Sequence, residues 1–182
     1  MDFTPTHIPD VIVIDPLVHE DGRGFLMETW QADRFRAAGI DANFVQDVHS
    51  RSTSGTVRGL HYQISQAQGK LIRVIRGEAF DVAVDLRKSS ATFGRWVGEI
   101  LSEENRKLIW VPPGFAHGFM VLSDVADFEY RMTDYHAPEY ARSIRWDDPD
   151  IAIAWPSEPG RVPLMSEADS NGVAFKNAEV YA

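Results

Sequence analysis

The sequence predicts an all-β protein, built as a closed or sandwiched antiparallel β architecture with one short early helix and an irregular C-terminal tail. Short runs rich in β-branched and aromatic residues alternate with turn residues along most of the chain. The spacing between these runs leaves no room for the helices that connect parallel strands. The 182 residues contain no linker or low-complexity tract, so we expect a single domain over 1–182.

The individual elements follow from local pattern. Helix formers over 31–38 end at Gly39, a common helix stop, and predict the one helix. We expect a polar loop over 19–24, and a hairpin turn at Arg76-Gly77-Glu78. From Asp134 onward the chain is rich in proline, with Trp146, Trp155 and Phe175 available to pin it to the sheets. Strands are expected over 11–14, 25–30, 44–50, 58–63, 70–76, 79–86, 96–101, 106–111, 116–122 and 127–132.

Composition excludes several classes of function. The net charge of −9 opposes binding to nucleic acid or to an anionic membrane, so we expect neither as a partner. The absence of cysteine excludes disulfides, thiolate catalysis and cysteine-ligated zinc, and it fits a reducing compartment. Residues 1–10 lack the pattern of a signal peptide, and no apolar run reaches membrane-spanning length. We therefore expect a soluble cytoplasmic protein.

The stretch 58–63, followed by Lys70, carries residues suited to proton transfer next to a carbonyl group. The imidazole of His61 titrates near neutral pH and can accept a proton without a metal. Arg58 and Lys70 could stabilise the resulting enolate, although a surface strand with solvated side chains is the alternative. Strand alternation places residues three apart on opposite faces. Arg58 and His61 can therefore share a site only if Gly59 forms a bulge, or if Arg58 precedes the pairing.

Residues 112–117 bear on whether the site holds a metal. They resemble the second signature of the cupin barrels, PxGxxH, which enters a strand. Metal-binding cupins supply an HxH pair and a Glu from the first signature, where this chain has His61-Tyr62-Gln63. His61 and His117 alone would hold a metal weakly, because stable sites use three or more protein ligands. We predict a cupin-like antiparallel β-barrel or jelly roll without a metal; a metal-dependent cupin oxygenase is the alternative.

Longer strings resemble one family in order and spacing, from Ile8 to Asp169: the dTDP-4-dehydrorhamnose 3,5-epimerases. The resemblance implies proton removal and return at C3 and C5 of a 4-keto-6-deoxyhexose on a nucleoside diphosphate, without a dissociable cofactor. The matching strings are 23–25, 44–47, 49–50, 58–63, 68–70, 77 with 80–87, 113–119, 130 with 133–134, and 166–167 with 169.

The resemblance implies five catalytic residues. His61 would be the base, oriented by Asp169, and Tyr130 would be the acid on the opposite face of the sugar ring. Arg58 and Lys70 would hold the C4 oxygen and its developing charge. General chemistry agrees, since inversion needs a proton taken from one face and delivered to the other. Tyr130 could instead cap the barrel with its ring, and Asp169 could be an ordinary loop acid.

The resemblance also implies a nucleotide-sugar site and a homodimer. Arg23 and Glu28 match positions that reach the substrate from a neighbouring subunit, so the first strands would exchange between protomers. His117 either contacts a substrate oxygen or is a core histidine. Asp81 could pair with Arg73 or support His61. The expected substrate-binding residues are Arg23, Phe25, Glu28, Gln46, His117, Tyr135 and His136.

Four positions depart from the family pattern. The family has Asn where this chain has Val48, an aromatic ring at His136, Glu at Ala141 and Lys at Ala168. In the family, all four positions lie near the nucleotide. Tyr135 could replace the missing ring, so the sequence leaves the base open and dTDP follows from the family alone. The alternatives are an epimerase of C3 or C5 only, a 3,4-ketoisomerase on a different nucleotide-linked sugar, and a non-catalytic sugar-nucleotide-binding cupin.

Overall fold

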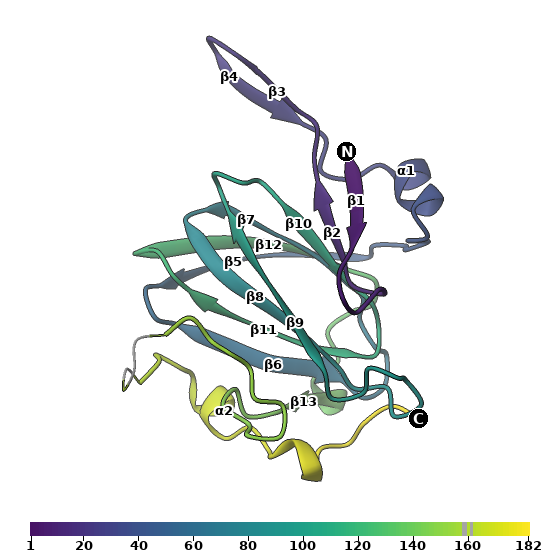
Figure 1. The fold of residues 1–182 in the computed structure, drawn as a ribbon, viewed down its shortest axis with the longest axis vertical. Coiled ribbons are helices and arrows are strands. Elements are labelled where there is room, and N and C mark those ends of the chain that lie inside the picture. Colours follow the sequence, from purple (N-terminus) through teal and green to yellow (C-terminus); the bar gives the residue numbers. More distant parts are fainter. Residues whose placement is uncertain (158–159, 161) are drawn as a thin grey trace.

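The computed structural model describes residues 1–157, 160 and 162–182, and most of this chain forms short antiparallel strands (Figure 1). The helical segments are α1 (Ala32–Ala37), α2 (Glu167–Ser170) and the 3₁₀ turns η1 (Pro138–Tyr140) and η2 (Phe175–Asn177). The strands are β1 (Asp2–Pro5), β2 (Ile12–Asp15), β3 (Val18–Asp21), β4 (Gly24–Met27), β5 (Gln46–Thr53), β6 (Val57–Gln63), β7 (Lys70–Arg76), β8 (Glu78–Asp85), β9 (Trp96–Ser102), β10 (Leu108–Val111), β11 (Phe115–Val121), β12 (Val125–Met132) and β13 (Ala141–Ser143).

Two packed sheets form the body of the protein and confirm the predicted all-β class. In the described part of the chain, one sheet has six strands in the order β1-β2-β10-β7-β12-β5, and the other has five in the order β13-β6-β11-β8-β9. Apolar side chains fill the space between them, with the rings of Phe119 and Phe128 stacked 3.9 Å apart. The predicted strand over 70–76 and the early helix both form where the sequence places them. No helix among the described residues is long and apolar enough to cross a membrane.

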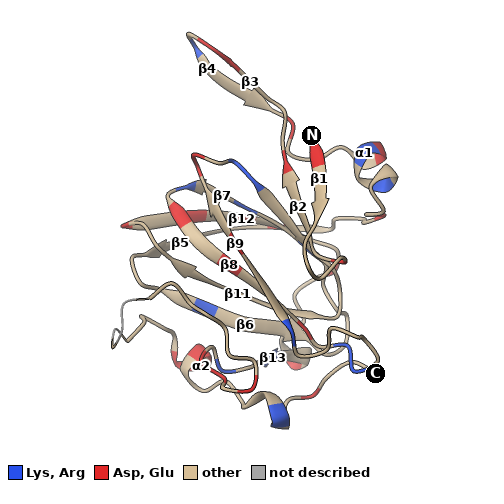
Figure 2. Ribbon diagram, viewed as in Figure 1, with Lys and Arg blue, Asp and Glu red and all other residues tan. Residues whose placement is uncertain are grey.

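The expected polar loop over 19–24 is wrong. Val18–Asp21 and Gly24–Met27 pair as β3 and β4 and make a hairpin that projects from the body (Figure 1). Acidic residues lie along β3 and a basic residue lies near the tip (Figure 2). The hairpin is exposed on both sides, so its sequence lacks the apolar and polar alternation that marks a half-buried strand.

The expected hairpin turn at Gly77 is also wrong. β7 and β8 belong to different sheets, and the chain crosses from one sheet to the other at this residue. Gly77 has a φ of 75°, and a Cβ there would lie 2.0 Å from the carbonyl oxygen of Val125. A corner this tight and a two-residue hairpin both favour glycine, which is why the local sequence did not separate them.

The C-terminal tail lies across the five-stranded sheet, and its aromatic residues pack there. Trp155 and Phe175 pack against the cluster of buried residues beneath the tail, and Trp155 Nε1 donates to the carbonyl oxygen of Trp146 at 2.8 Å. The tail is less irregular than predicted, because β13 pairs with β6 and extends this sheet by one strand. A three-residue strand is too short to leave a periodic pattern in the sequence.

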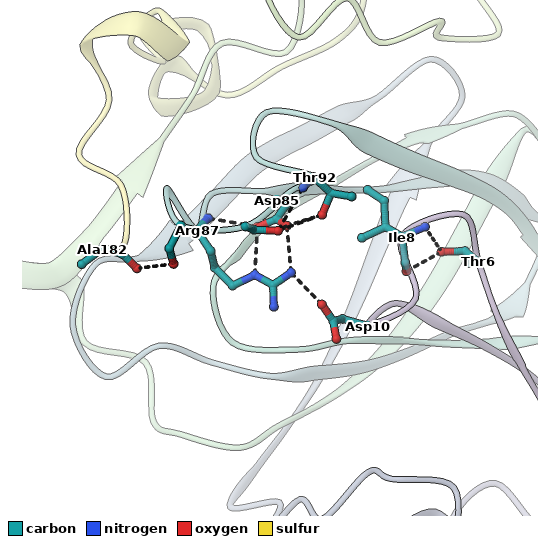
Figure 3. Close-up of polar contacts among 9 residues, drawn as sticks. Thr6, Ile8, Asp10, Asp85, Arg87, Thr92 and Ala182 are labelled. Atoms are coloured by element: carbon teal, nitrogen blue, oxygen red, sulfur yellow. Dashed lines mark hydrogen bonds and ion pairs between the residues drawn. The ribbon is translucent and has the colours of Figure 1, made fainter.

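A buried carboxylate at the end of β8 anchors the N-terminal segment through Arg87 (Figure 3). Asp85 is fully buried and accepts hydrogen bonds from Arg87, Ser90 and Thr92 at 2.7 to 2.9 Å. Arg87 also pairs with Asp10 in the N-terminal segment at 2.7 Å. Burial opposes the charged carboxylate, but these hydrogen bonds outweigh it and lower the pKa of Asp85 to about 2.

The substitution Asp85→Asn should destabilise the protein in a pH-dependent way. It leaves Arg87 without its buried carboxylate, so we expect a loss of about 3 kcal/mol in the free energy of unfolding at pH 7. The folded pKa lies below the unfolded value, so the carboxylate stabilises fully above about pH 4 and loses its effect as the pH falls toward about 2. Urea unfolding across this range should show the two proteins converging; a constant difference would contradict the assignment.

Candidate active site

A cavity of about 530 Å³ lies between the two sheets. The six-stranded sheet contributes side chains from β5, β7 and β12, and the five-stranded sheet contributes side chains from β6, β11 and β13. The lining residues are Val48, Ser50, Arg58, His61, Tyr62, Gln63, Gln68, Lys70, His117, Phe119, Tyr130, Met132, His136, Ala141, Arg142, Ser143 and Ala168. The cavity therefore collects the polar residues of the 58–63 stretch together with a lysine and a tyrosine from the facing sheet.

A bulge in β6 brings Arg58 and His61 into this one cavity. His61 pairs with His117 while Arg58 pairs with Phe119, so three steps along β6 match two steps along β11. The extra residue reverses the alternation between them, and the expected bulge at Gly59 is confirmed. Gly59 has a φ of 115°, and a Cβ there would lie 2.5 Å from the Cα of Gly118.

His61 is held by a buried carboxylate. Its Nε2 lies 2.5 Å from Oδ1 of Asp169, which is 4% exposed and also accepts from Ser166 Oγ at 2.7 Å. Burial favours the neutral acid, but hydrogen bonds from His61 and Ser166 outweigh it and lower the pKa of Asp169 to about 2. When the Nε2–H of His61 donates to the carboxylate, the lone pair stays on Nδ1. That nitrogen, without a hydrogen-bond partner among the described residues, can accept a proton.

Tyr130 enters the cavity from the opposite sheet. Its ring stacks on Phe128, and its hydroxyl lies 2.6 Å from Oγ of Ser50. Burial, aided by the charge of Asp81, raises the pKa of Tyr130 to about 12 despite the opposing hydrogen bond of Ser50. The phenol is therefore protonated at neutral pH and can donate a proton. Because β6 and β12 lie in different sheets, His61 and Tyr130 line the cavity from its two walls.

Two cations in the cavity have no acidic partner within the described part of the chain. Arg58 Nε donates to Ser52 Oγ at 3.0 Å, and no carboxylate of the described residues lies within 4.0 Å of the charged nitrogens of Arg58 or Lys70. Burial lowers the pKa of Lys70 to about 8, against the opposing charge of Asp81. Lys70 is thus mainly protonated at neutral pH. Such uncompensated charges stabilise an oxygen that gains negative charge during a reaction.

His117 both lines the cavity and belongs to a buried pair. Its Nε2 lies 2.8 Å from Oδ2 of Asp81, and burial lowers its pKa although Asp81 opposes that shift. Asp81 supports neither of its expected partners, since Arg73 pairs with Glu129 and His61 with Asp169. The described residues contain no cluster of three or more His, Cys, Asp or Glu side chains that could hold a metal ion.

The other predicted substrate residues lie outside the cavity, with one exception. Arg23 pairs with Asp21 at the hairpin tip, and Phe25 lies under the guanidinium of Arg106. Glu28 lies 3.3 Å from Arg34, and Gln46 accepts from the backbone of His136. Tyr135 is 63% exposed, whereas the neighbouring His136 lines the cavity.

Several cavity residues left no signal that the sequence analysis detected. Ser52 lies on β5 in the facing sheet and, although it does not line the cavity, accepts from the cavity residue Arg58, a contact that becomes visible only once the two sheets are packed together. Arg142 and Ser143 line the cavity from β13, which was not predicted as a strand. Met132 lies two residues beyond Tyr130 on the same strand face, and the alternation of β12 could have identified it.

A known protein family matches most of the chain. The family model for dTDP-4-dehydrorhamnose 3,5-epimerase matches residues 5–177. The chain belongs to this family. It is an isomerase of the epimerase class, as the resemblance predicted.

Individual relatives cover nearly the whole chain. The dTDP-4-dehydrorhamnose 3,5-epimerase of Pseudomonas aeruginosa is 54% identical over 182 residues, which is 100% of this chain and 99% of the relative. The Legionella pneumophila 3,5-epimerase, solved with dTDP-4-keto-L-rhamnose, is 48% identical with a TM-score of 0.94, covering 98% of this chain and 94% of that one. A 3'-monoepimerase of Streptomyces bikiniensis, solved with dTDP-quinovose, is 34% identical with a TM-score of 0.87, covering 94% and 86%. The cupin-like fold prediction is confirmed.

The substitution Gly59→Ala tests the bulge. A Cβ at a φ of 115°, 2.5 Å from Gly118 Cα, should cost at least about 2 kcal/mol of unfolding free energy, since the left-handed conformation alone costs about 1–2 kcal/mol. Gly22→Ala is the matched control, because a Cβ there meets nothing within 4 Å; it should change stability by less than about 0.5 kcal/mol. Urea unfolding measures both, and equal stabilities would show that the bulge does not require glycine.

Proposed function

We propose that His61, Tyr130, Asp169, Arg58 and Lys70 together epimerise C3 and C5 of a dTDP-linked 4-keto-6-deoxyhexose. The observation that carries this proposal is the arrangement of His61 and Tyr130 on opposite walls of one cavity. An acid and a base facing each other suit inversion of a carbon held between them. Arg58 and Lys70 line the same cavity without an acidic partner among the described residues, which supports a role in stabilising the charge on a ketone oxygen.

The chemical step follows from these groups. Nδ1 of His61 removes the proton α to the ketone, the electron pair of that C–H bond forms the new C=C bond, and the π pair of the carbonyl moves onto the C4 oxygen. Arg58 and Lys70 stabilise the resulting enolate. Tyr130 then donates its phenolic proton to the opposite face of the carbon, which restores the ketone with inverted configuration. Exchange with solvent returns a proton to Tyr130 and removes one from His61 before the second carbon reacts.

The dTDP part of the proposal is supported by the relatives. Those that are about half identical over nearly the whole chain carry the 3,5-epimerase name, and the Legionella protein is solved with a dTDP-linked keto sugar. Val48, His136, Ala141 and Ala168 all line the cavity, so the four departures from the family pattern bear on this ligand. The 3'-monoepimerase is less identical to this chain than these 3,5-epimerases are, so inversion of a single carbon is the second candidate reaction.

Turnover in heavy water tests the reaction. We expect deuterium at both C3 and C5 of the product, because each inversion replaces a carbon-bound proton with one from solvent. His61→Asn should lower turnover and label incorporation at least about a hundredfold, which is typical for the loss of a general base. His49→Asn is the matched control, since His49 lies on β5 outside the cavity, beside Asp127. Label at only one carbon would contradict the double inversion.

We also propose a homodimer in which the β3–β4 hairpin docks on a second copy of the chain. The hairpin projects from the body (Figure 1), and Leu17, Phe25 and Leu26 near it are 55%, 57% and 70% exposed. A two-stranded hairpin is marginally stable alone, so such apolar side chains favour a partner surface. Docking would also bring Arg23 and Glu28 toward the cavity of the partner.

A cytoplasmic location is proposed on the absence of cysteine.

The substitution Leu26→Asp tests the homodimer. A charge buried at the interface should shift the wild-type dimer toward monomer in sedimentation velocity at equal concentration. Val162→Asp is the matched control, because Val162 is 84% exposed on a different part of the surface and should leave the mass unchanged. A wild-type protein that sediments as a monomer, or a Leu26→Asp variant that remains dimeric, would contradict the proposal.

A further inference from the structure

The segment 134–137 reaches the cavity without belonging to a strand. It follows β12 and precedes η1, and His136 within it lines the cavity. Three glutamine side chains hold its backbone. Two of the contacts are to carbonyl oxygens: Gln68 Nε2 donates to Asp134 O at 2.9 Å, and Gln63 Nε2 donates to Tyr135 O at 3.2 Å. The other two are to backbone N–H groups: Gln46 Oε1 accepts from His136 N at 2.9 Å, and Gln63 Oε1 accepts from Ala137 N at 2.8 Å. Side chains thus replace the backbone partners that a strand would have.

Gln63 is the central member of this group. It lies two residues after His61 on β6 and is 4% exposed. Its amide nitrogen uses both hydrogens, one toward Tyr135 O and one toward Gln66 O at 2.8 Å, while its amide oxygen accepts from Ala137. Although Gln63 is part of the cavity wall, its amide hydrogens are committed to backbone carbonyls. It therefore acts on a ligand through the segment that it holds.

These contacts determine which ring faces the cavity. Gln63 binds the carbonyl before His136 and the N–H after it, and Gln46 binds the N–H of His136 itself. With these three backbone groups held, His136 lines the cavity while keeping an exposed surface, and Tyr135, which is 63% exposed, does not line it. The hydrogen bond from Ala137 N to Gln63 is buried, and a buried backbone group that loses its partner is costly, so the amide of Gln63 favours this arrangement.

We propose that Gln63, together with Gln46, is a positioning residue that sets the cavity wall at His136 and thereby the affinity for substrate. We expect these glutamines to affect substrate binding and not proton transfer, because His61 and Tyr130 are held in place by other residues. His61 is held by Asp169 and Tyr130 by Ser50, and neither support comes from the segment 134–137. The kinetic part of this inference rests on the proposed function.

The variant Gln63→Met tests the inference, because methionine has a similar length but cannot replace the amide. Amide hydrogen exchange of residues 134–137 should become at least about tenfold faster, a factor that corresponds to about 1.4 kcal/mol, because the variant loses the contacts to Tyr135 O and Ala137 N. With the dTDP-linked keto sugar, KM should rise about tenfold, matching the same free energy, while kcat changes less than about twofold. Gln66→Met is the matched control and should change neither, since the Gln66 side chain is exposed and makes no hydrogen bond within the described residues.

Each alternative outcome has a distinct meaning. In folded protein, a fall in kcat at unchanged KM would assign the effect to the chemical step and overturn the positioning role, as would an unchanged KM with unchanged exchange. If the wild type turns over no dTDP-linked sugar, the proposed function fails and amide hydrogen exchange alone tests the inference. Equal exchange rates of residues 134–137 in the wild type and the variant would then overturn it. If Gln63→Met does not fold, Gln46→Met removes only the contact to His136 and should still raise KM and the exchange of that amide; no change in either would overturn the role.

Discussion

The presence of Arg58 and His61 in one cavity depends on one extra residue in β6. Regular alternation would turn these side chains to opposite faces of the sheet, and the bulge at Gly59 turns them to the same face. The backbone there lies so close to Gly118 that neither strand has room for a side chain at this contact. The N–H of Gly59 also donates to Oδ1 of Asp169 at 3.3 Å. The same short stretch of backbone therefore helps to place a cation, an imidazole and the carboxylate that supports it.

The site also depends on parts of the chain that lie far from it in sequence. Asp169 belongs to the C-terminal tail, which stays on the five-stranded sheet through aromatic packing and through Tyr181, whose hydroxyl donates to the carbonyl oxygen of Gln63. The tail thereby supports both His61 and the glutamine that holds the wall at His136. Tyr130 and Lys70 come from the facing sheet, so the distance between the acid and the base is set by the packing of the two sheets. Proton transfer between opposite walls is thus a property of the whole sandwich.

Local sequence patterns predicted the elements that have strong local causes. The β-branched run of β7 was placed with its observed bounds, and a bulge at Gly59 was one of the two arrangements that the sequence allowed for a site shared by Arg58 and His61. Patterns failed where the outcome depends on distant contacts. Gly77 suits a hairpin and a corner between sheets equally well, and the corner forms because β7 and β8 have partners in different sheets. The pairing of Asp81 with His117 likewise depends on the register of β8 and β11, which periodicity alone does not give.

A crystal structure of the protein with dTDP-quinovose, a 4-hydroxy sugar that lacks the ketone needed for proton abstraction, would test the central claim most directly. The account predicts a sugar ring between His61 and Tyr130, one on each face. It also predicts an O4 atom within about 3.2 Å of a nitrogen of Arg58 or Lys70. A sugar bound with His61 and Tyr130 on the same face, or with O4 directed away from both cations, would contradict it.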